Sequence, residues 1–140
     1  MSIRSLLSNR SVVSVAPQTS VREIVALLDR HRIGAVLVLD SESIVGIVSE
    51  RDIVGELAQQ GAGVLDATAG AVMTSPVVTV DPDASIPAAM ATMTNRRIRH
   101  LPVVAGGALV GLVSIGDLVK RRIEEAEGEA SALKDYISAA

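Results

Sequence analysis

The stretch Gly46-Ile47-Val48-Ser49-Glu50-Arg51-Asp52 decides the fold, because it returns 65 positions later as Gly111-Leu112-Val113-Ser114-Ile115-Gly116-Asp117. The same spacing holds upstream without a gap, in the pairs Val12/Val77, Val13/Val78, Val15/Val80, Pro17/Pro82, Ser20/Ser85, Arg32/Arg97 and Val38/Val103. A self-similar period of this size is typical of two copies of one supersecondary unit that bury their apolar faces against each other. The chain is therefore a tandem duplication, and we expect neither half to be stable alone.

Hydrophobic patterning predicts the elements of the first copy. Residues 11–15 alternate polar and apolar side chains and predict a strand, and Ser20 with Glu23 forms a capping box that opens a helix ending near residue 31. Residues 35–39 and 44–48 predict a β-hairpin around a polar turn, and a closing helix begins at Ser49. The copy thus reads strand–helix–strand–strand–helix.

The second copy predicts the same order. Residues 77–80 predict the strand, and Ser85 caps a helix that carries Pro87 in its first turn. The hairpin strands are predicted at 101–104 and 108–113 around Gly106 and Gly107, and Ser114 opens the last helix. The fold class is therefore α/β (α+β).

We divide the chain into a leading helix or hook at 1–7, a first repeat at 8–63, a second repeat at 64–122 and a C-terminal helix at 123–140. Residues 59–63 predict a flexible junction and residues 66–73 a short turn of helix. In the tail, Gly128 is expected to weaken the helix, and Leu133, Tyr136 and Ile137 form an apolar stripe. Two alternatives stay open: the stripe contacts a partner such as a second copy, or it folds back onto its own core.

Composition narrows the function. The net charge of −3 and the single aromatic residue, Tyr136, argue against a general nucleic-acid surface and against base stacking on rings. The absence of Cys excludes disulfides and Cys-based zinc sites, and no metal is predicted. No segment resembles a secretory signal or a membrane span, so we expect a soluble cytoplasmic protein that does not bind membranes.

The repeated Ser-x-x-Asp stands at a predicted strand-to-helix transition. In one interpretation it only caps a helix. In the other, the helix N-terminus attracts a phosphate while the carboxylate accepts hydrogen bonds from a ribose diol. The basic segments at 30–32 and 96–100 hold equivalent places and either bind phosphate or end a solvated helix. Arg99 and His100 are the better phosphate candidates, because strand alternation should turn at least one of them inward.

No catalytic set is present. The two histidines, His31 and His100, lie far apart in the sequence, and there is neither a P-loop nor a dinucleotide fingerprint. We therefore expect a protein that is not an enzyme.

These residues resemble a known family, the pair of CBS (cystathionine-β-synthase) domains called a Bateman module. The resemblance is carried by both Gly-x-Val-Ser-x-x-Asp motifs, by Val-Met-Thr-Ser-Pro-Val-Val-Thr-Val-Asp-Pro at 72–82 and by Arg-His-Leu-Pro-Val-Val at 99–104. It implies two pseudo-symmetric β-α-β-β-α CBS repeats packed through their sheets, with two clefts for adenosine-containing ligands.

By the resemblance, Asp117 and Asp52 bind ribose, one in each cleft, and Ser114 and Ser49 face ribose or phosphate. The cleft of Asp117 would hold adenine near four residues and phosphate at Arg99; the four are Val13, Ile33, Gly34 and Ala35. The cleft of Asp52 would be surrounded by Thr74, Val78, Ile98 and His100, with Arg51 as a phosphate donor. The two clefts differ in charge, since Arg99 corresponds to Gly34 and Arg51 to Gly116.

The resemblance extends to stand-alone bacterial CBS-pair proteins, which look like homodimers that sense adenine nucleotides and in some cases NAD(H). We therefore expect a non-enzymatic, cytoplasmic, homodimeric regulator that binds AMP, ADP, ATP or NAD(H) between its repeats and signals by a conformational change to an unknown regulated protein. The alternative is a ligand-free dimerisation or protein-interaction module in which Ser-x-x-Asp only caps helices. A nucleic-acid role ranks third.

Overall fold

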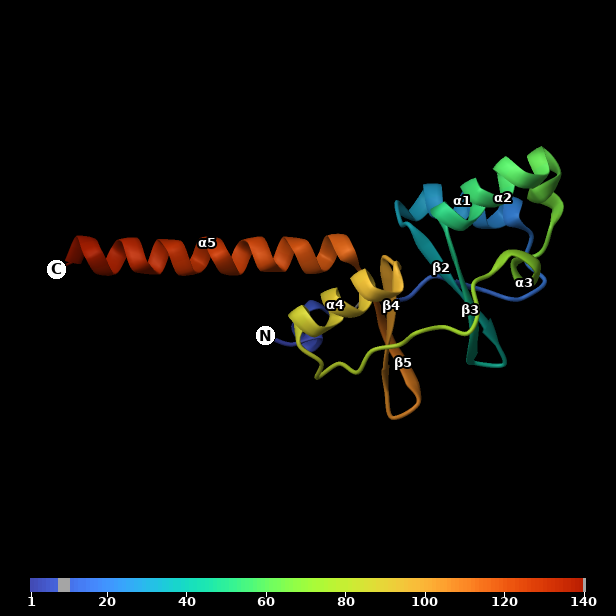
Figure 1. Cartoon of the computed structure of the whole chain (residues 1–140). Helices are drawn as coiled ribbons and strands as arrows, with labels where there is room; N and C mark the ends of the chain where they lie inside the picture. Colours follow the sequence, from blue (N-terminus) through green and yellow to red (C-terminus); the bar gives the residue numbers. More distant parts are fainter. Residues whose placement is uncertain (8–10, 140) are drawn as a thin grey trace. The chain divides into compact units, whose positions relative to one another are not determined.

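The computed structural model describes residues 1–7 and 11–139 (Figure 1). The chain falls into two compact units, Arg10–Val78, called here the first-repeat unit, and Met1–Asn9 with Thr79–Ala140, called the second-repeat unit. Helix and strand are mixed in both, which confirms the predicted α/β (α+β) class of two repeats.

The first-repeat unit contains a three-stranded sheet in the order β1-β2-β3. The strands are β1 (Ser14–Val15), β2 (Ala35–Asp40) and β3 (Ser43–Ser49). β1 lies parallel to β2, with Ser14 opposite Leu37, and β2 and β3 form the predicted antiparallel hairpin. The strand predicted over 11–15 is wrong in length. In this register Ser11 falls opposite Gly34, which precedes β2, so no strand residue lies opposite the start of the predicted strand.

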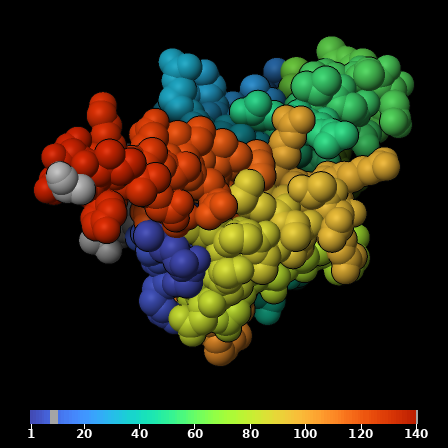
Figure 2. Space-filling view, turned by 60° about the vertical axis from the view of Figure 1, so that its left-hand side comes forward, coloured from blue at the N-terminus to red at the C-terminus, as the bar shows by residue number. Residues whose placement is uncertain are grey.

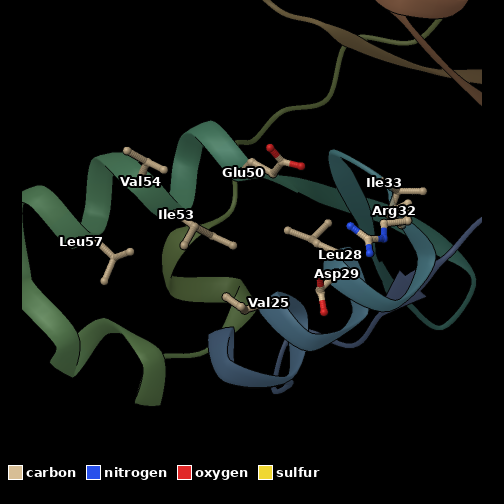
Figure 3. Close-up of a pocket in the computed structure, with 9 residues that line it drawn as sticks. All are labelled: Val25, Leu28, Asp29, Arg32, Ile33, Glu50, Ile53, Val54 and Leu57. Carbon is tan, nitrogen blue, oxygen red and sulfur yellow. The ribbon is translucent and has the colours of Figure 1, made fainter.

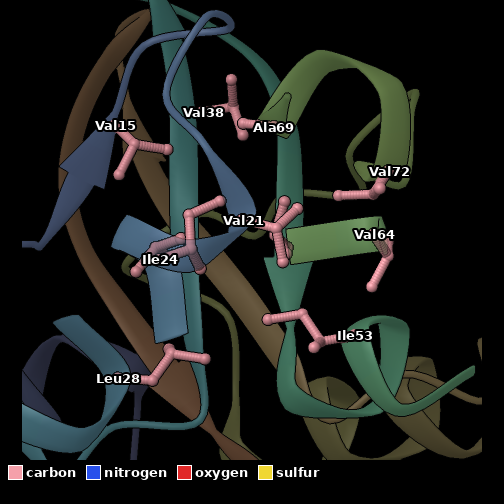
Figure 4. Close-up of a cluster of buried hydrophobic side chains, with 11 residues drawn as sticks. Val15, Val21, Ile24, Leu28, Val38, Ile53, Val64, Ala69 and Val72 are labelled. Atoms are coloured by element: carbon pink, nitrogen blue, oxygen red, sulfur yellow. The ribbon is translucent and has the colours of Figure 1, made fainter. Parts of the chain in front are cut away.

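Two helices cover this sheet, α1 (Val21–His31) and α2 (Glu50–Gln60). The Ser20 hydroxyl accepts a hydrogen bond from the Glu23 N–H (3.2 Å), so one half of the predicted capping box is present. The reciprocal half is wrong: no hydrogen bond between the described residues reaches the Glu23 carboxylate, which is exposed. Their inward side chains and those of the sheet form one aliphatic core, shown in Figure 4. Its fully buried members include Val21, Ile24, Val36, Val38 and Val48.

The predicted flexible junction at 59–63 is wrong. α2 continues to Gln60 and leads directly into a 3-10 helix, η2 (Gly61–Asp66). Val64 of η2 is buried in the core of the first-repeat unit, and this burial holds a segment whose glycines alone predict flexibility. A short helix, α3 (Ala69–Val72), follows within the helical turn predicted over 66–73, which confirms that prediction.

The second-repeat unit has a two-stranded sheet of β4 (His100–Ala105) and β5 (Ala108–Ser114), next to helix α4 (Ile86–Arg96). The hairpin is confirmed, but the strand predicted over 77–80 shrinks to one parallel bridge between Val80 and Val103. In the first repeat the Leu37 N–H donates to the Val13 carbonyl (3.3 Å). In the second repeat Leu37 corresponds to Pro102, which has no N–H, so the equivalent hydrogen bond to the Val78 carbonyl cannot form.

The N-terminal segment belongs to the second-repeat unit and begins with the short 3-10 helix η1 (Ile3–Leu6), as predicted for residues 3–7. The backbone hydrogen bonds that hold this segment correspond to those that hold residues 67–70 in the first-repeat unit. The Ile3 N–H donates to the Ala84 carbonyl (2.9 Å), as the Ala69 N–H does to Thr19 (2.7 Å). The Arg4 N–H donates to the Pro82 carbonyl (2.7 Å), as the Gly70 N–H does to Pro17 (2.9 Å). Residues 1–7, which precede the first repeat in the sequence, thus pack in the second-repeat unit. Residues 67–70, which precede the second repeat, pack in the first-repeat unit.

The last helix, α5 (Ile115–Ala139), is 25 residues long and runs through Gly128 without a break. Its first turns pack on the second-repeat unit, where the Arg121 guanidinium donates to the Ser5 hydroxyl (3.1 Å). Figure 2 shows the N-terminal segment in dark blue against α4 in yellow and α5 in orange to red. Leu133, Tyr136 and Ile137 are 60%, 75% and 65% exposed, so the alternative in which the stripe folds back onto its own core is wrong.

Candidate functional site

The first Ser-x-x-Asp forms a complete capping box where β3 passes into α2. Asp52 Oδ2 accepts hydrogen bonds from the Ser49 N–H (2.9 Å) and the Ser49 hydroxyl (3.0 Å), and Ser49 Oγ accepts one from the Asp52 N–H (3.2 Å). The other carboxylate oxygen, Oδ1, accepts from the Thr74 hydroxyl (3.2 Å). Both oxygens of this half-buried carboxylate are therefore engaged within the unit.

The second Ser-x-x-Asp repeats the cap where β5 passes into α5. Asp117 Oδ2 accepts from the Ser114 N–H (2.8 Å), and Ser114 Oγ accepts from the Asp117 N–H (3.2 Å). Asp117 is exposed, and among the described residues no group donates to its Oδ1. The capping interpretation is thus confirmed for both motifs. It occupies one oxygen of each carboxylate; the other oxygen accepts from Thr74 in Asp52 and has no donor among the described residues in Asp117.

Predicted ligand-binding residues of the first-repeat unit gather beside the start of α2. Ala35 pairs with Ser49 across the hairpin, and the Gly34 carbonyl accepts from the Glu50 N–H (2.9 Å). Thr74 reaches the same edge because its backbone exchanges two hydrogen bonds with Ile47 of β3 (2.9 and 3.1 Å). The unit also contains four further predicted residues; Val13, Ile33 and Val78 are half-buried and Arg51 is exposed.

The second-repeat unit places Ile98, Arg99 and His100 in the corresponding position. His100 pairs with Ser114, and the Arg99 carbonyl accepts from the Ile115 N–H (2.8 Å). Arg99 is exposed and His100 is half-buried, as strand alternation predicts for one of the two. In both repeats the structure thus brings a hydroxyl, a carboxylate and a helix N-terminus next to the approach to the first hairpin strand.

The two predicted ligand sets each draw on both units. Asp117 and Arg99 belong to the second-repeat unit, whereas Val13, Ile33, Gly34 and Ala35 belong to the first-repeat unit. The grouping of these residues into two clefts therefore stays a prediction. So do the ribose, adenine and phosphate roles of the individual side chains.

Sequence reasoning missed an apolar groove between α1 and α2 in the first-repeat unit (Figure 3). Its volume is about 550 Å³. Its lining comprises Val25, Leu28, Asp29, Arg32, Ile33, Glu50, Ile53, Val54 and Leu57. Val54 is 65% exposed. In the sequence, the groove could have been indicated by Val25 and Val54, two apolar residues that lie outside the buried faces of α1 and α2. Ile33 is the one predicted ligand-binding residue among these nine.

Other kinds of site find no support in the described part of the chain. No three His, Asp or Glu side chains among the described residues come together as a candidate metal site. No helix within the described ranges combines the length and the apolarity that crossing a bilayer requires.

Comparison with known proteins identifies the family. The CBS domain model matches residues 3–59 and again residues 69–124, so the chain belongs to the CBS domain family and carries two such domains in tandem. The resemblance inferred from the motifs is therefore confirmed.

Three similar proteins illustrate the match. The crystal structure of the CBS-domain containing protein ATU1752 from Agrobacterium tumefaciens is 40% identical, with a TM-score of 0.84 over 87% of this chain and 99% of that chain. The CBS domain protein PAE2072 from Pyrobaculum aerophilum, complexed with AMP, is 33% identical, with a TM-score of 0.75 over 84% of this chain and 89% of that chain. The mitochondrial CBS domain-containing protein CBSX3 of Arabidopsis thaliana is 33% identical over 84% of this chain, which spans 60% of the length of that relative.

Proposed function

We propose that this chain is a non-enzymatic regulatory protein that binds an adenosine nucleotide through its two Ser-x-x-Asp edges. The observation that carries the proposal is the duplicated arrangement of cap, carboxylate and helix N-terminus beside residues 33–35 and 98–100. A helix N-terminus favours phosphate, and a carboxylate is a good acceptor for a ribose diol. The similar protein from Pyrobaculum aerophilum, which is complexed with AMP, supports the ligand class.

Within this proposal Asp117 is the principal ribose acceptor. Its cap leaves Oδ1 without a donor among the described residues, whereas Thr74 already donates to Oδ1 of Asp52. Arg99, which is exposed, supplies the phosphate donor, and Ser114 faces ribose or phosphate. The ligand is AMP, ADP, ATP or the AMP half of NAD(H). The protein acts in the cytoplasm as a homodimer, and a conformational change on binding is read by a regulated protein.

A second candidate is a ligand-free dimerisation or interaction module. The observation in its favour is the Asp52 carboxylate, whose two oxygens are both satisfied by Ser49 and Thr74. In this alternative the motifs only cap helices, and the exposed part of α5 recruits another protein.

A thermal-shift titration separates the two candidates. AMP, ADP, ATP, NAD, NADH and S-adenosylmethionine are compared with GTP as the control nucleotide. At about 100 times Kd a ligand adds roughly 2.7 kcal/mol to the free energy of unfolding, which is several degrees for a chain of this size. A selective adenosine response supports the regulator, and no response to any of these compounds supports the ligand-free module.

A pair of variants tests the role of Asp117. Asn at position 117 can still accept the Ser114 N–H through its amide oxygen, so Asp117→Asn keeps the cap but removes the negative charge. We expect it to weaken nucleotide binding, because a ribose diol bonds less strongly to an amide than to a carboxylate. Asp135→Asn, on the exposed part of the same helix, is the matched control. Equal affinities in the two variants would remove Asp117 from the ribose site.

A further inference from the structure

The exposed part of α5 carries a regular apolar seam. Its members alternate at spacings of four and three residues: Val119, Ile123, Ala126, Ala130, Leu133 and Ile137. All six side chains are exposed to solvent. The alternation of four and three is the heptad period at which one helix presents a continuous stripe to a second helix. The seam spans about 27 Å at 1.5 Å per residue.

The two faces of α5 have separate uses. Leu118 and Arg121 lie on the face that the second-repeat unit covers: Leu118 is buried, and Arg121 donates to Ser5 and Met1. Glu125, one turn after Arg121, is half-buried. In heptad notation these three residues take the c and f positions, while the seam takes a and d. The contacts of α5 with its own unit therefore leave the seam open. Gly128 also falls at f, away from the seam.

The residue types at the seam fit a parallel two-stranded coiled coil. Ile123, Ala130 and Ile137 occupy the a positions, and Val119, Ala126 and Leu133 occupy d. β-Branched residues at a with Leu at d favour two parallel strands. In a parallel pair the two alanines form two consecutive small layers, Ala126 against Ala126 and Ala130 against Ala130, which let the helix axes approach closely between the larger layers on either side.

The flanking charges select the same arrangement. In a parallel, in-register pair each g residue faces the e residue five positions further along the partner helix. These pairs are Arg122 with Glu127 and Glu129 with Lys134, and both are of opposite charge. An antiparallel pair centred on Gly128 also matches the apolar layers, but it sets Glu129 against Glu129 and Lys120 against Lys134 of the second copy. Like charges at these positions disfavour that alternative.

We propose that two copies of this chain associate through α5 as a parallel, in-register two-stranded coiled coil with residues 119–137 as its seam. This inference specifies the contact that makes the homodimer of the proposed function, and it stands independently of nucleotide binding.

Disulfide cross-linking tests the orientation, since the chain has no cysteine of its own. In the parallel pair the two residues at position 133 face each other, so Leu133→Cys should form a covalent dimer under mild oxidation. In the antiparallel pair position 133 faces position 123, so a mixture of Ile123→Cys and Leu133→Cys chains would form the mixed dimer instead. Ser131→Cys, at an exposed b position, is the control and should give no covalent dimer. Failure of Leu133→Cys to cross-link, or preference for the mixed dimer, overturns the proposal.

Charge reversal tests the register. Glu129→Lys places like charges opposite each other at both symmetric Glu129–Lys134 contacts and should weaken the dimer about tenfold in sedimentation equilibrium. Adding Lys134→Glu to the same chain should restore the wild-type dimer, because the pairs are then reversed in sign. If the second substitution restores nothing, the register is wrong. A Leu133→Asp chain, which should be monomeric, is also titrated with nucleotide. A nucleotide response of this monomer would show that ligand binding does not depend on the coiled coil, so the two proposals can fail separately.

Discussion

The two repeats share one motif and one order of elements, yet they differ at three places that the duplication alone does not explain. The first has a three-stranded sheet where the second has two strands and a single bridge. Ser41 and Glu42 form the hairpin turn of the first, and Gly106 and Gly107 that of the second, all four with positive φ. The glycine of the motif faces Met73 in one unit and Leu7 in the other. A duplicated sequence therefore keeps its topology while its local packing diverges.

The largest difference is expected at the motif glycines. A Cβ on Gly46 would lie 2.3 Å from Met73 Sδ and 2.9 Å from Met73 Cβ, so the backbone of the packed segment has to move. A Cβ on Gly111 would meet the end of the Leu7 side chain at 2.6 Å, and that methyl can rotate away. We expect Gly46→Ala to cost about 2–3 kcal/mol and Gly111→Ala about 1 kcal/mol. Urea unfolding of the two variants measures this, and equal costs would show that the two segments pack with the same tolerance.

An intermediate difference is expected at the caps. Asp52→Ala removes the bond from the Ser49 N–H to the carboxylate and also leaves the Thr74 hydroxyl without its acceptor. Asp117→Ala removes, among the described contacts, only the corresponding bond from the Ser114 N–H. In both variants the serine hydroxyl can still accept the backbone N–H of the substituted residue. We expect a loss of about 1–2 kcal/mol for Asp52→Ala and about 1 kcal/mol for Asp117→Ala.

The matched control is Thr74→Val, because a Val side chain keeps the shape but does not donate. The Asp52 cost should shrink when it is measured in that background. An unchanged cost would mean that the Thr74 bond contributes nothing to the difference between the caps.

The smallest difference is expected at the hairpin turns. Glu42 has a φ of 72° and Gly107 one of 82°, a region that suits glycine and strains other residues. Glu42→Gly should gain only a few tenths of a kcal/mol, since relief of strain is offset by the greater freedom of glycine in the unfolded chain. Gly107→Ala should lose about 1 kcal/mol. Thermal melts that move in opposite directions, by about 3 °C per kcal/mol, support this comparison; a drop in both would contradict it.

Local chemistry was readable from the sequence. The hydroxyls of Ser20, Ser49, Ser85 and Ser114 each accept the predicted backbone N–H, because a cap needs only residues within one turn of each other. Both hairpins also follow from short-range patterns. The missing rung at Pro102 was visible in the sequence too, since proline has no N–H, yet the strand over 77–80 was predicted as the copy of the strand over 11–15.

Contacts between distant segments were not readable. Nothing local to residues 59–63 shows that Val64 is buried, and nothing in residues 1–7 shows that they complete the second-repeat unit. The groove between α1 and α2 likewise depends on how two helices sit on one sheet. The ligand-binding roles of the candidate site stay predictions, because they rest on the family resemblance and on residues of both units.

The sequence by itself determined the duplication, the family, the order of elements, the capped helix starts and an apolar stripe in the C-terminal tail. These follow from identities and spacings within a few turns of the chain, where the geometry of helix and strand translates spacing directly into position. Only the tertiary structure decided which segment completes which repeat, which face of α5 its own unit covers, and that both oxygens of Asp52 are occupied. Those outcomes depend on competition between buried surfaces far apart in the chain, which no local pattern encodes.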